Sequence, residues 1–275
     1  MLNTSYKLIS YVLSQSGQML RPSLVYFTAY ACNPRISPDI REKLIRFAGA
    51  VELLHTASLV HDDIIDFSRE RRERPSVFGL YGISGALLTG NALYLAAFDL
   101  AGGLLDRPQV EGIVLSATEM CCGEFLQMGW KNSRIPKQVY LDIIARKTGS
   151  LMKYTCREAA RLAGWEAREL PRVQRLGECL GVLYQMADDC RDLDVELEPD
   201  FSFSAEAERY TREAEGLLRL FDESIYKKAL KDFLEHIAGI FAQTAGEGYP
   251  GSSRLERKGG LQTDIRGEKP PAAGA

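Results

Sequence analysis

Apolar residues recur along most of the chain at the three- and four-residue spacing of amphipathic helices, and no run alternates apolar and polar residues as a strand does. Proline, glycine and capping residues mark the ends of these helical stretches. The pattern predicts helices over about residues 3–14, 23–31, 38–66, 84–105, 109–128, 137–162, 171–192 and 205–243. We therefore expect an all-α fold in which residues 1–245 form a single helical domain.

The end of the chain has a different composition. From Gly246 onward glycine, proline and charged residues predominate, and the sequence closes on Lys269-Pro270-Pro271 followed by small residues. Such a segment has too few apolar side chains to form a core, so we expect residues 246–275 to be a disordered tail.

The helix expected from Pro38 changes character along one face. The apolar run Val51–Val60 gives way to the segment His61-Asp62-Asp63-Ile64-Ile65-Asp66. Because residues four apart share a helical face, Asp62 and Asp66 point the same way, with Asp63 beside them. Carboxylates this close repel one another, which favours a multivalent cation between them.

The same spacing occurs a second time, at Asp188, Asp189 and Asp192, again after an apolar run, Leu180–Ala187. One such motif alone is usually a solvated helix end. Its recurrence on a second buried helical face favours two clusters that face each other and hold a hard cation together with a phosphorylated ligand.

Cationic residues that suit such a ligand lie in two places. The segment Arg69–Pro75, directly after the first aspartates, holds four arginines, and guanidinium groups bind phosphate oxygens bidentately. Lys147 lies in the middle of the helix expected over 137–162, where the nearby Gly149 permits a kink or a close approach. Taken alone, an arginine cluster is usually a solvated loop, and Lys147 could equally be an exposed surface lysine.

Composition sets broader limits. The 275 residues are 45% hydrophobic and 26% charged with a formal net charge of −3, which is typical of a soluble globular protein and gives no reason to expect nucleic acid as a partner. The six cysteines show no CxxC spacing and, without a signal peptide at the start, indicate reduced, buried thiols in a cytoplasmic protein. The uncharged stretch Pro75–Phe98 is long enough to span a bilayer, but its glycines favour a buried core helix, so we expect no integral membrane segment.

Taken in order, the motifs resemble those of the all-trans isoprenyl diphosphate synthase (polyprenyl synthetase) family over about residues 17–192. The matching pieces are Gly17-x-x-x-Arg21-Pro22, Glu52-x-x-His55-Thr56-Ala57, His61-Asp62-Asp63-x-x-Asp66, Arg71-Arg72, Arg74-Pro75-Ser76, Lys147-Thr148-Gly149 and Tyr184-Gln185-x-x-Asp188-Asp189-x-x-Asp192. The resemblance implies an isoprenoid-synthase-type helical bundle around a deep central cavity, assembled as a homodimer or with a second polypeptide.

The resemblance also implies a reaction in which Mg²⁺ assists the condensation of isopentenyl diphosphate with an allylic prenyl diphosphate. By position, the metal ligands are Asp62, Asp66 and Asp188, supported by Asp63, Asp189 and Asp192. By the same resemblance, Arg71 and Lys147 would bind the allylic diphosphate, and isopentenyl diphosphate would be bound by Arg21, His55 and Arg72. Thr148 and Gln185 are expected to line the reacting centre. The small residues Ala57 and Ser58 imply an all-trans product of geranylgeranyl length or longer.

Departures from the family pattern leave three interpretations open. Gln18 and Met19 replace basic residues, Gly90-Asn91 and Gly123-Glu124 replace Gly-Asp and Gly-Gln, and no lysine occurs between Lys153 and Lys227. The chain is then a working prenyltransferase, an enzyme of the terpene-synthase kind that only ionises a prenyl diphosphate, or a non-catalytic partner subunit. The retained aspartates argue against the third interpretation, and the retained Arg21, His55 and Arg72 favour the first over the second.

Overall fold

The computed structural model describes residues 2–14, 17–103, 105–192 and 195–246. In chain order its helices are α1 (Leu2–Ser14), α2 (Leu20–Cys32), α3 (Pro38–Ile65), α4 (Val77–Gly102), α5 (Arg107–Gly129), α6 (Lys137–Ile144), α7 (Ser150–Leu162), α8 (Leu170–Asp192), α9 (Phe203–Leu218) and α10 (Ile225–Gly246). A π-helical turn, η1 (Ala145–Gly149), joins α6 to α7, and a 3-10 turn, η2 (Ala167–Glu169), precedes α8. The expected all-α class is confirmed, whereas the expected disordered tail falls, beyond Gly246, outside the described residues.

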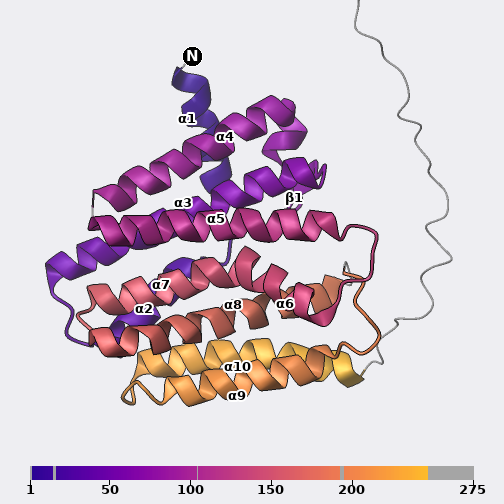
Figure 1. Cartoon of the computed structure of the whole chain (residues 1–275). Helices are drawn as coiled ribbons and strands as arrows, with labels where there is room; N and C mark the ends of the chain where they lie inside the picture. The colour runs from indigo at the N-terminus through magenta and orange to yellow at the C-terminus, as the bar shows by residue number, and fades with distance from the viewer. Residues whose placement is uncertain (1, 15–16, 104, 193–194, 247–275) are drawn as a thin grey trace, which may run out of the picture.

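The helices pack as a bundle in which α7 and α8 lie between α5 and the α9–α10 pair (Figure 1). α3 packs on α4, α7 packs on α8, and α2 contacts both α3 and α7, while the α9–α10 pair covers α8. One large apolar core joins these helices. A second, smaller cluster lies where α1, α3 and α4 meet, around Val12, Ala57, Val60, Phe78 and Leu93.

The start of α3 follows from its sequence. Ser37 is the N-cap residue, its hydroxyl accepts a hydrogen bond from the Ile40 amide at 3.3 Å, and Pro38 occupies the first turn. The expected apolar face is buried, with Leu44 and Phe47 fully enclosed in the core. Because this face is buried, α3 runs through the core. Its last turn, which holds the first aspartates, lies at the cavity described below.

The prediction for α4 was wrong in two respects. The helix begins at Val77 rather than near residue 84, because Ser76 caps it and Gly82, with φ of 66°, absorbs a kink inside it. It is also not a buried core helix, since its outer face leaves large apolar side chains exposed: Leu80, Tyr81, Ile83, Leu87, Leu88 and Leu95. Of the described helices, α4 is long and apolar enough to cross a membrane, and 28% of its most apolar stretch is buried in the fold.

Two cysteines also differ from expectation. All six thiols are free, and Cys32, Cys156, Cys179 and Cys190 are buried as predicted. Cys121 and Cys122, both on α5, are exposed instead, and Cys121 borders the main cavity. The apolar residues around them in the sequence favoured a core position, but in the fold no helix covers these two side chains completely.

The long helix expected over 137–162 is interrupted by the π-turn η1. Glycines from two neighbouring helices press on this turn: a Cβ at Gly123 of α5 would lie 2.7 Å from the Lys147 amide nitrogen, and one at Gly181 of α8 would lie 2.8 Å from the Gly149 Cα. A π-turn inserts an extra residue and rotates the side chains that follow it. Lys147 and Thr148 lie within this turn, and both line the main cavity.

The close approach at η1 predicts that alanine substitutions at two glycines change the free energy of unfolding in opposite directions. Gly181→Ala should lower the free energy of unfolding by about 1–3 kcal/mol, because the new methyl group overlaps the backbone of η1. Gly216→Ala on exposed α9, where a Cβ meets nothing within 4 Å, should raise it by about 0.5–1 kcal/mol. Urea unfolding measures both, and equal effects would contradict the packing described for η1.

Candidate active site

A cavity of about 370 Å³ opens between α2, α3, α4, α5, η1 and α8, a size usual for small-ligand sites. Its charged and polar lining consists of Arg21, His55, Ser58, His61, Asp62, Arg71, Arg72, Cys121, Glu124, Lys147, Thr148, Tyr184, Gln185 and Asp188. Its apolar lining, with Tyr94, consists of Leu59, Ile65, Met120, Phe125 and Met128. Residues from distant parts of the sequence thus converge on one space.

The cavity gathers most of the predicted site residues but not all of them. Among those expected to bind metal or substrate, Ala57, Asp63, Asp66, Asp189 and Asp192 do not line it. Ala57 is fully buried in the smaller core cluster, while Ser58 faces the cavity. Asp66 and Asp192 are exposed at the ends of α3 and α8.

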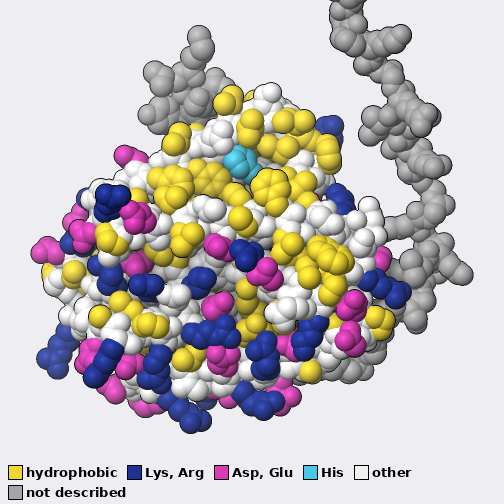
Figure 2. Space-filling model, in the orientation of Figure 1, with side chains coloured by type: hydrophobic (Ala, Val, Ile, Leu, Met, Phe, Trp, Pro, Cys, Tyr) yellow, Lys and Arg dark blue, Asp and Glu magenta, His cyan; other side chains and the backbone are white. Residues whose placement is uncertain are grey.

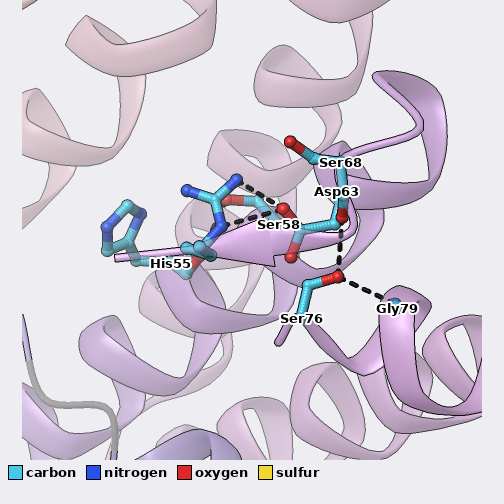
Figure 3. A network of polar contacts seen from close by, with 7 residues as sticks. His55, Ser58, Asp63, Ser68, Ser76 and Gly79 are labelled. Atoms are coloured by element: carbon cyan, nitrogen blue, oxygen red, sulfur yellow. Dashed lines mark hydrogen bonds and ion pairs between the residues drawn. The ribbon is translucent and has the colours of Figure 1, made fainter. Parts of the chain in front are cut away.

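The two adjacent aspartates of the first motif have different environments. Burial, with smaller contributions from Glu124 and Asp66, raises the pKa of Asp62 to about 6, although Lys147 and Arg71 act in the opposite direction. Asp63 is buried and accepts from Nε and Nη2 of Arg71, both at 2.9 Å (Figure 3). Asp63 therefore fixes Arg71, while Asp62 faces the cavity.

A short hairpin after α3 positions the arginines. Its strands, β1 (Glu70–Arg71) and β2 (Arg74–Pro75), pair antiparallel, and the two turn residues between them have φ of 52° and 61°. These left-handed values are typical of tight two-residue hairpin turns. The Ser76 hydroxyl donates to the Ser68 carbonyl at 2.6 Å and accepts from the Gly79 amide at 2.9 Å, which ties the hairpin to α4 (Figure 3).

The second motif is held by a side-chain network. The Tyr140 hydroxyl donates to Asp189 at 2.6 Å, and the Gln185 amide donates to the same carboxylate at 3.0 Å. Gln185 accepts in turn from the Thr148 hydroxyl at 2.6 Å. Asp188 faces the cavity and pairs with Arg191. The sequence analysis missed Tyr140, although it precedes Lys147 by seven residues, two helical turns, on the same predicted helix.

Four cationic side chains also line the cavity: Arg21, Arg71, Arg72 and Lys147. Arg21 is only 8% exposed, and its Nε has no hydrogen-bond partner among the described residues. Burial, reinforced by the charges of Arg21, Arg72 and Arg71, holds the pKa of His55 well below its usual value, so its imidazole is neutral. Burying a cation whose donors are not all satisfied is costly, and an anion in the cavity would supply the missing acceptors.

The donor set fits Mg²⁺ that is shared with a phosphate ligand. Among the described residues, no three His, Cys, Asp or Glu side chains lie close enough to hold a metal ion by themselves. Mg²⁺ usually binds through one or two carboxylates plus substrate phosphates rather than in a cage made only of protein groups. Asp62 and Asp188 on the cavity wall, with three arginines in the same lining, match that mode of binding.

Comparison with solved structures shows that the fold is the isoprenoid synthase fold. A decaprenyl diphosphate synthase from Rhodobacter capsulatus superposes with a TM-score of 0.77 at 20% identity, over 86% of this chain and 90% of that one. A geranyltranstransferase from Thermotoga maritima gives 0.71 at 26% identity, over 88% and 90% of the two chains.

The sequence comparisons identify the family. The family model described as Polyprenyl synthetase matches residues 3–198. A short chain isoprenyl diphosphate synthase from Methanocaldococcus jannaschii is 31% identical over 192 residues, which cover 68% of this chain and 57% of that protein. A geranylgeranyl diphosphate synthase from Methanosarcina mazei is 29% identical over 194 residues, covering 68% and 58%. The chain belongs to the polyprenyl synthetase family and spans less than three fifths of the length of these two relatives.

The raised pKa of Asp62 predicts a pH-dependent stability. The unfolded chain loses this proton near the ordinary value of 3.8, whereas the folded chain keeps it to about 6. The folded state therefore binds more protons in this window, and its stability falls as the pH rises from about 4 to about 6. Because Asp62→Asn removes this loss, the variant should exceed the wild type by up to about 3 kcal/mol above about pH 7 and by little below about pH 4. Urea unfolding as a function of pH measures the difference, and a difference independent of pH would contradict the assignment.

Proposed function

We propose that the protein is a Mg²⁺-dependent prenyltransferase that condenses isopentenyl diphosphate with an allylic prenyl diphosphate to give an all-trans polyprenyl diphosphate. One observation carries the proposal: a single cavity brings together Asp62 and Asp188, the cations Arg21, Arg71, Arg72 and Lys147, and apolar walls. Such a space suits a ligand with a multiply charged head and a hydrocarbon tail. The names of the relatives, which are prenyl diphosphate synthases, support the same chemistry.

On the allylic side, Asp62, Asp66 and Asp188 would hold Mg²⁺, with Asp63, Asp189 and Asp192 in support. The metal, when bound, supplies positive charge that stabilises the departing diphosphate. Arg71, fixed by Asp63, and Lys147, delivered by η1, bind the diphosphate oxygens from the protein side. Their placement would orient the carbon–oxygen bond that breaks between the allylic group and its diphosphate.

On the isopentenyl side, Arg21, Arg72 and neutral His55 would bind the second diphosphate. The unpaired Nε of Arg21 is a donor that such a ligand satisfies. Gln18, which stands where the family has a lysine, lines a separate pocket beside α10 and not the main cavity. Its neutral side chain therefore leaves the cations of the main cavity in place, which supports condensation over ionisation alone.

Between the two diphosphates, the linked side chains of Thr148 and Gln185 border the reacting centre. Leu59 and Met120 provide apolar walls that would exclude water from an allylic cation. Ser58, which faces the cavity, is too small to obstruct a growing chain at that depth. We propose a product of geranylgeranyl length or longer.

The assembly we propose is a cytoplasmic homodimer formed through the outer faces of α4 and α5. Large apolar side chains gather over these two helices (Figure 2). The most exposed are Leu88 and Leu95 on α4, at 68% and 69%, and Leu115 and Phe125 on α5, at 61% and 72%. Contiguous apolar surface of this kind usually marks a protein interface.

The first experiment is an incubation of the purified protein with Mg²⁺, labelled isopentenyl diphosphate and each allylic diphosphate in turn. We expect labelled prenyl diphosphate, and we expect Asp62→Ala to lower its rate of formation by at least about a thousandfold without loss of helical content. Pyrophosphate release without incorporation would instead show an ionising enzyme of the terpene-synthase kind. No reaction of either type would favour a partner subunit, and full activity of Asp62→Ala would refute the metal assignment.

The proposed dimer predicts a specific effect of charge on α4. Leu95→Glu should convert the dimer to a monomer at micromolar concentration, because the new carboxylate would be buried between the subunits. Ile225→Glu, at an equally exposed position (74%) at the start of α10, should leave the dimer intact. Light scattering coupled to size-exclusion chromatography distinguishes the two states; a wild-type monomer would rule the dimer out.

A further inference from the structure

The ammonium group of Lys147 is held by two acceptors from α5. It forms an ion pair with Glu124 and donates a hydrogen bond to the side-chain oxygen of Gln127 at 3.1 Å. The two acceptors lie three residues apart and therefore share a helical face. The side chains of Lys147 and Glu124 are 24% and 14% exposed, so water screens their charges only in part.

This ion pair lies beside the first carboxylate of the site. Glu124 and Lys147 line the same cavity as Asp62, and their opposite charges act on that carboxylate in opposite directions. Glu124 therefore has two electrostatic effects: it neutralises much of the positive charge that Lys147 presents to an anion, and it adds negative charge near Asp62.

Packing alone does not account for a carboxylate at position 124. A shielded ion pair stabilises a fold weakly, because desolvation of the two charges offsets their attraction. Gln127 already provides the ammonium group with an uncharged acceptor. A glutamine at position 124 would offer a second uncharged acceptor of the same size and leave the lysine charge uncompensated.

We propose that Glu124 is a positioning residue that makes diphosphate binding in this cavity depend on a divalent cation. The inference rests on the proposed function and adds a role to a residue of the same site. With Glu124 present, a diphosphate without metal meets two carboxylates, Glu124 and Asp62, around one lysine. A divalent cation bound at Asp62 reverses the sign of that local charge, so metal and diphosphate bind as a unit.

The test is the affinity of the full chain for inorganic pyrophosphate, measured by calorimetry with EDTA and again with Mg²⁺. Glu124→Gln should raise the metal-free affinity by about tenfold and reduce the gain due to Mg²⁺ by a similar factor. Glu119→Gln is the matched control, because Glu119 also lies on α5 and pairs with Arg146 at 2.7 Å but does not line the cavity. This control should leave both affinities unchanged.

A double-mutant cycle shows whether the effect runs through the lysine. In a Lys147→Met background, Glu124→Gln should no longer change the dependence on Mg²⁺. An unchanged dependence in the Glu124→Gln single variant, in protein with normal thermal unfolding, would overturn the proposal. So would a loss of Mg²⁺-supported binding with metal-free binding unchanged, since Glu124 would then be a metal ligand. Failure of the wild-type chain to bind pyrophosphate with Mg²⁺ would instead refute the proposed function itself.

Discussion

The structure depends on holding opposite charges around one cavity without letting them neutralise each other completely. Several charged groups of the site are held in place by neighbouring side chains. Asp63 fixes Arg71, Tyr140 and Gln185 fix Asp189, and Arg191 contacts Asp188. Unsupported side chains would collapse into ion pairs across the cavity, because isolated charges in a partly dry space attract strongly. The surrounding helices keep that space open, and the rest of the bundle provides the rigid core on which they rest.

Much of the fold follows from local sequence. The N-cap at Ser37, the proline after it and the apolar face of α3 act within a few turns of helix, so their outcome could be predicted. The π-turn at η1 could not, because its cause lies in other helices: Gly123 and Gly181 approach its backbone from two sides. The exposed face of α4 is similar, since its residues have core-like character and only tertiary packing decides which of them are covered.

The site shows the same division between local and long-range information. Helical periodicity correctly grouped the aspartates of each motif at one helix end. It did not separate Asp62, which faces the cavity, from Asp63, which is 3% exposed and bound to an arginine eight residues further on. That distinction depends on the hairpin folding back onto α3. Tyr140 was missed for a related reason: its role depends on a hydrogen bond to α8, which no spacing within its own helix records.

The hairpin also limits how the site can change during evolution. Arg71, the last residue of β1, lies against Asp63, whereas a Cβ at Gly17 would lie 2.7 Å from the guanidinium of Arg72, the first turn residue. One tight turn thus directs two consecutive guanidinium groups to different neighbours. Single substitutions can alter either placement separately. Insertion or deletion of one residue would break the two-residue turn, which the positive φ values of Arg72 and Glu73 define, and would disturb both placements at once. The length of this loop should therefore vary far less among descendants of this sequence than the identity of its residues.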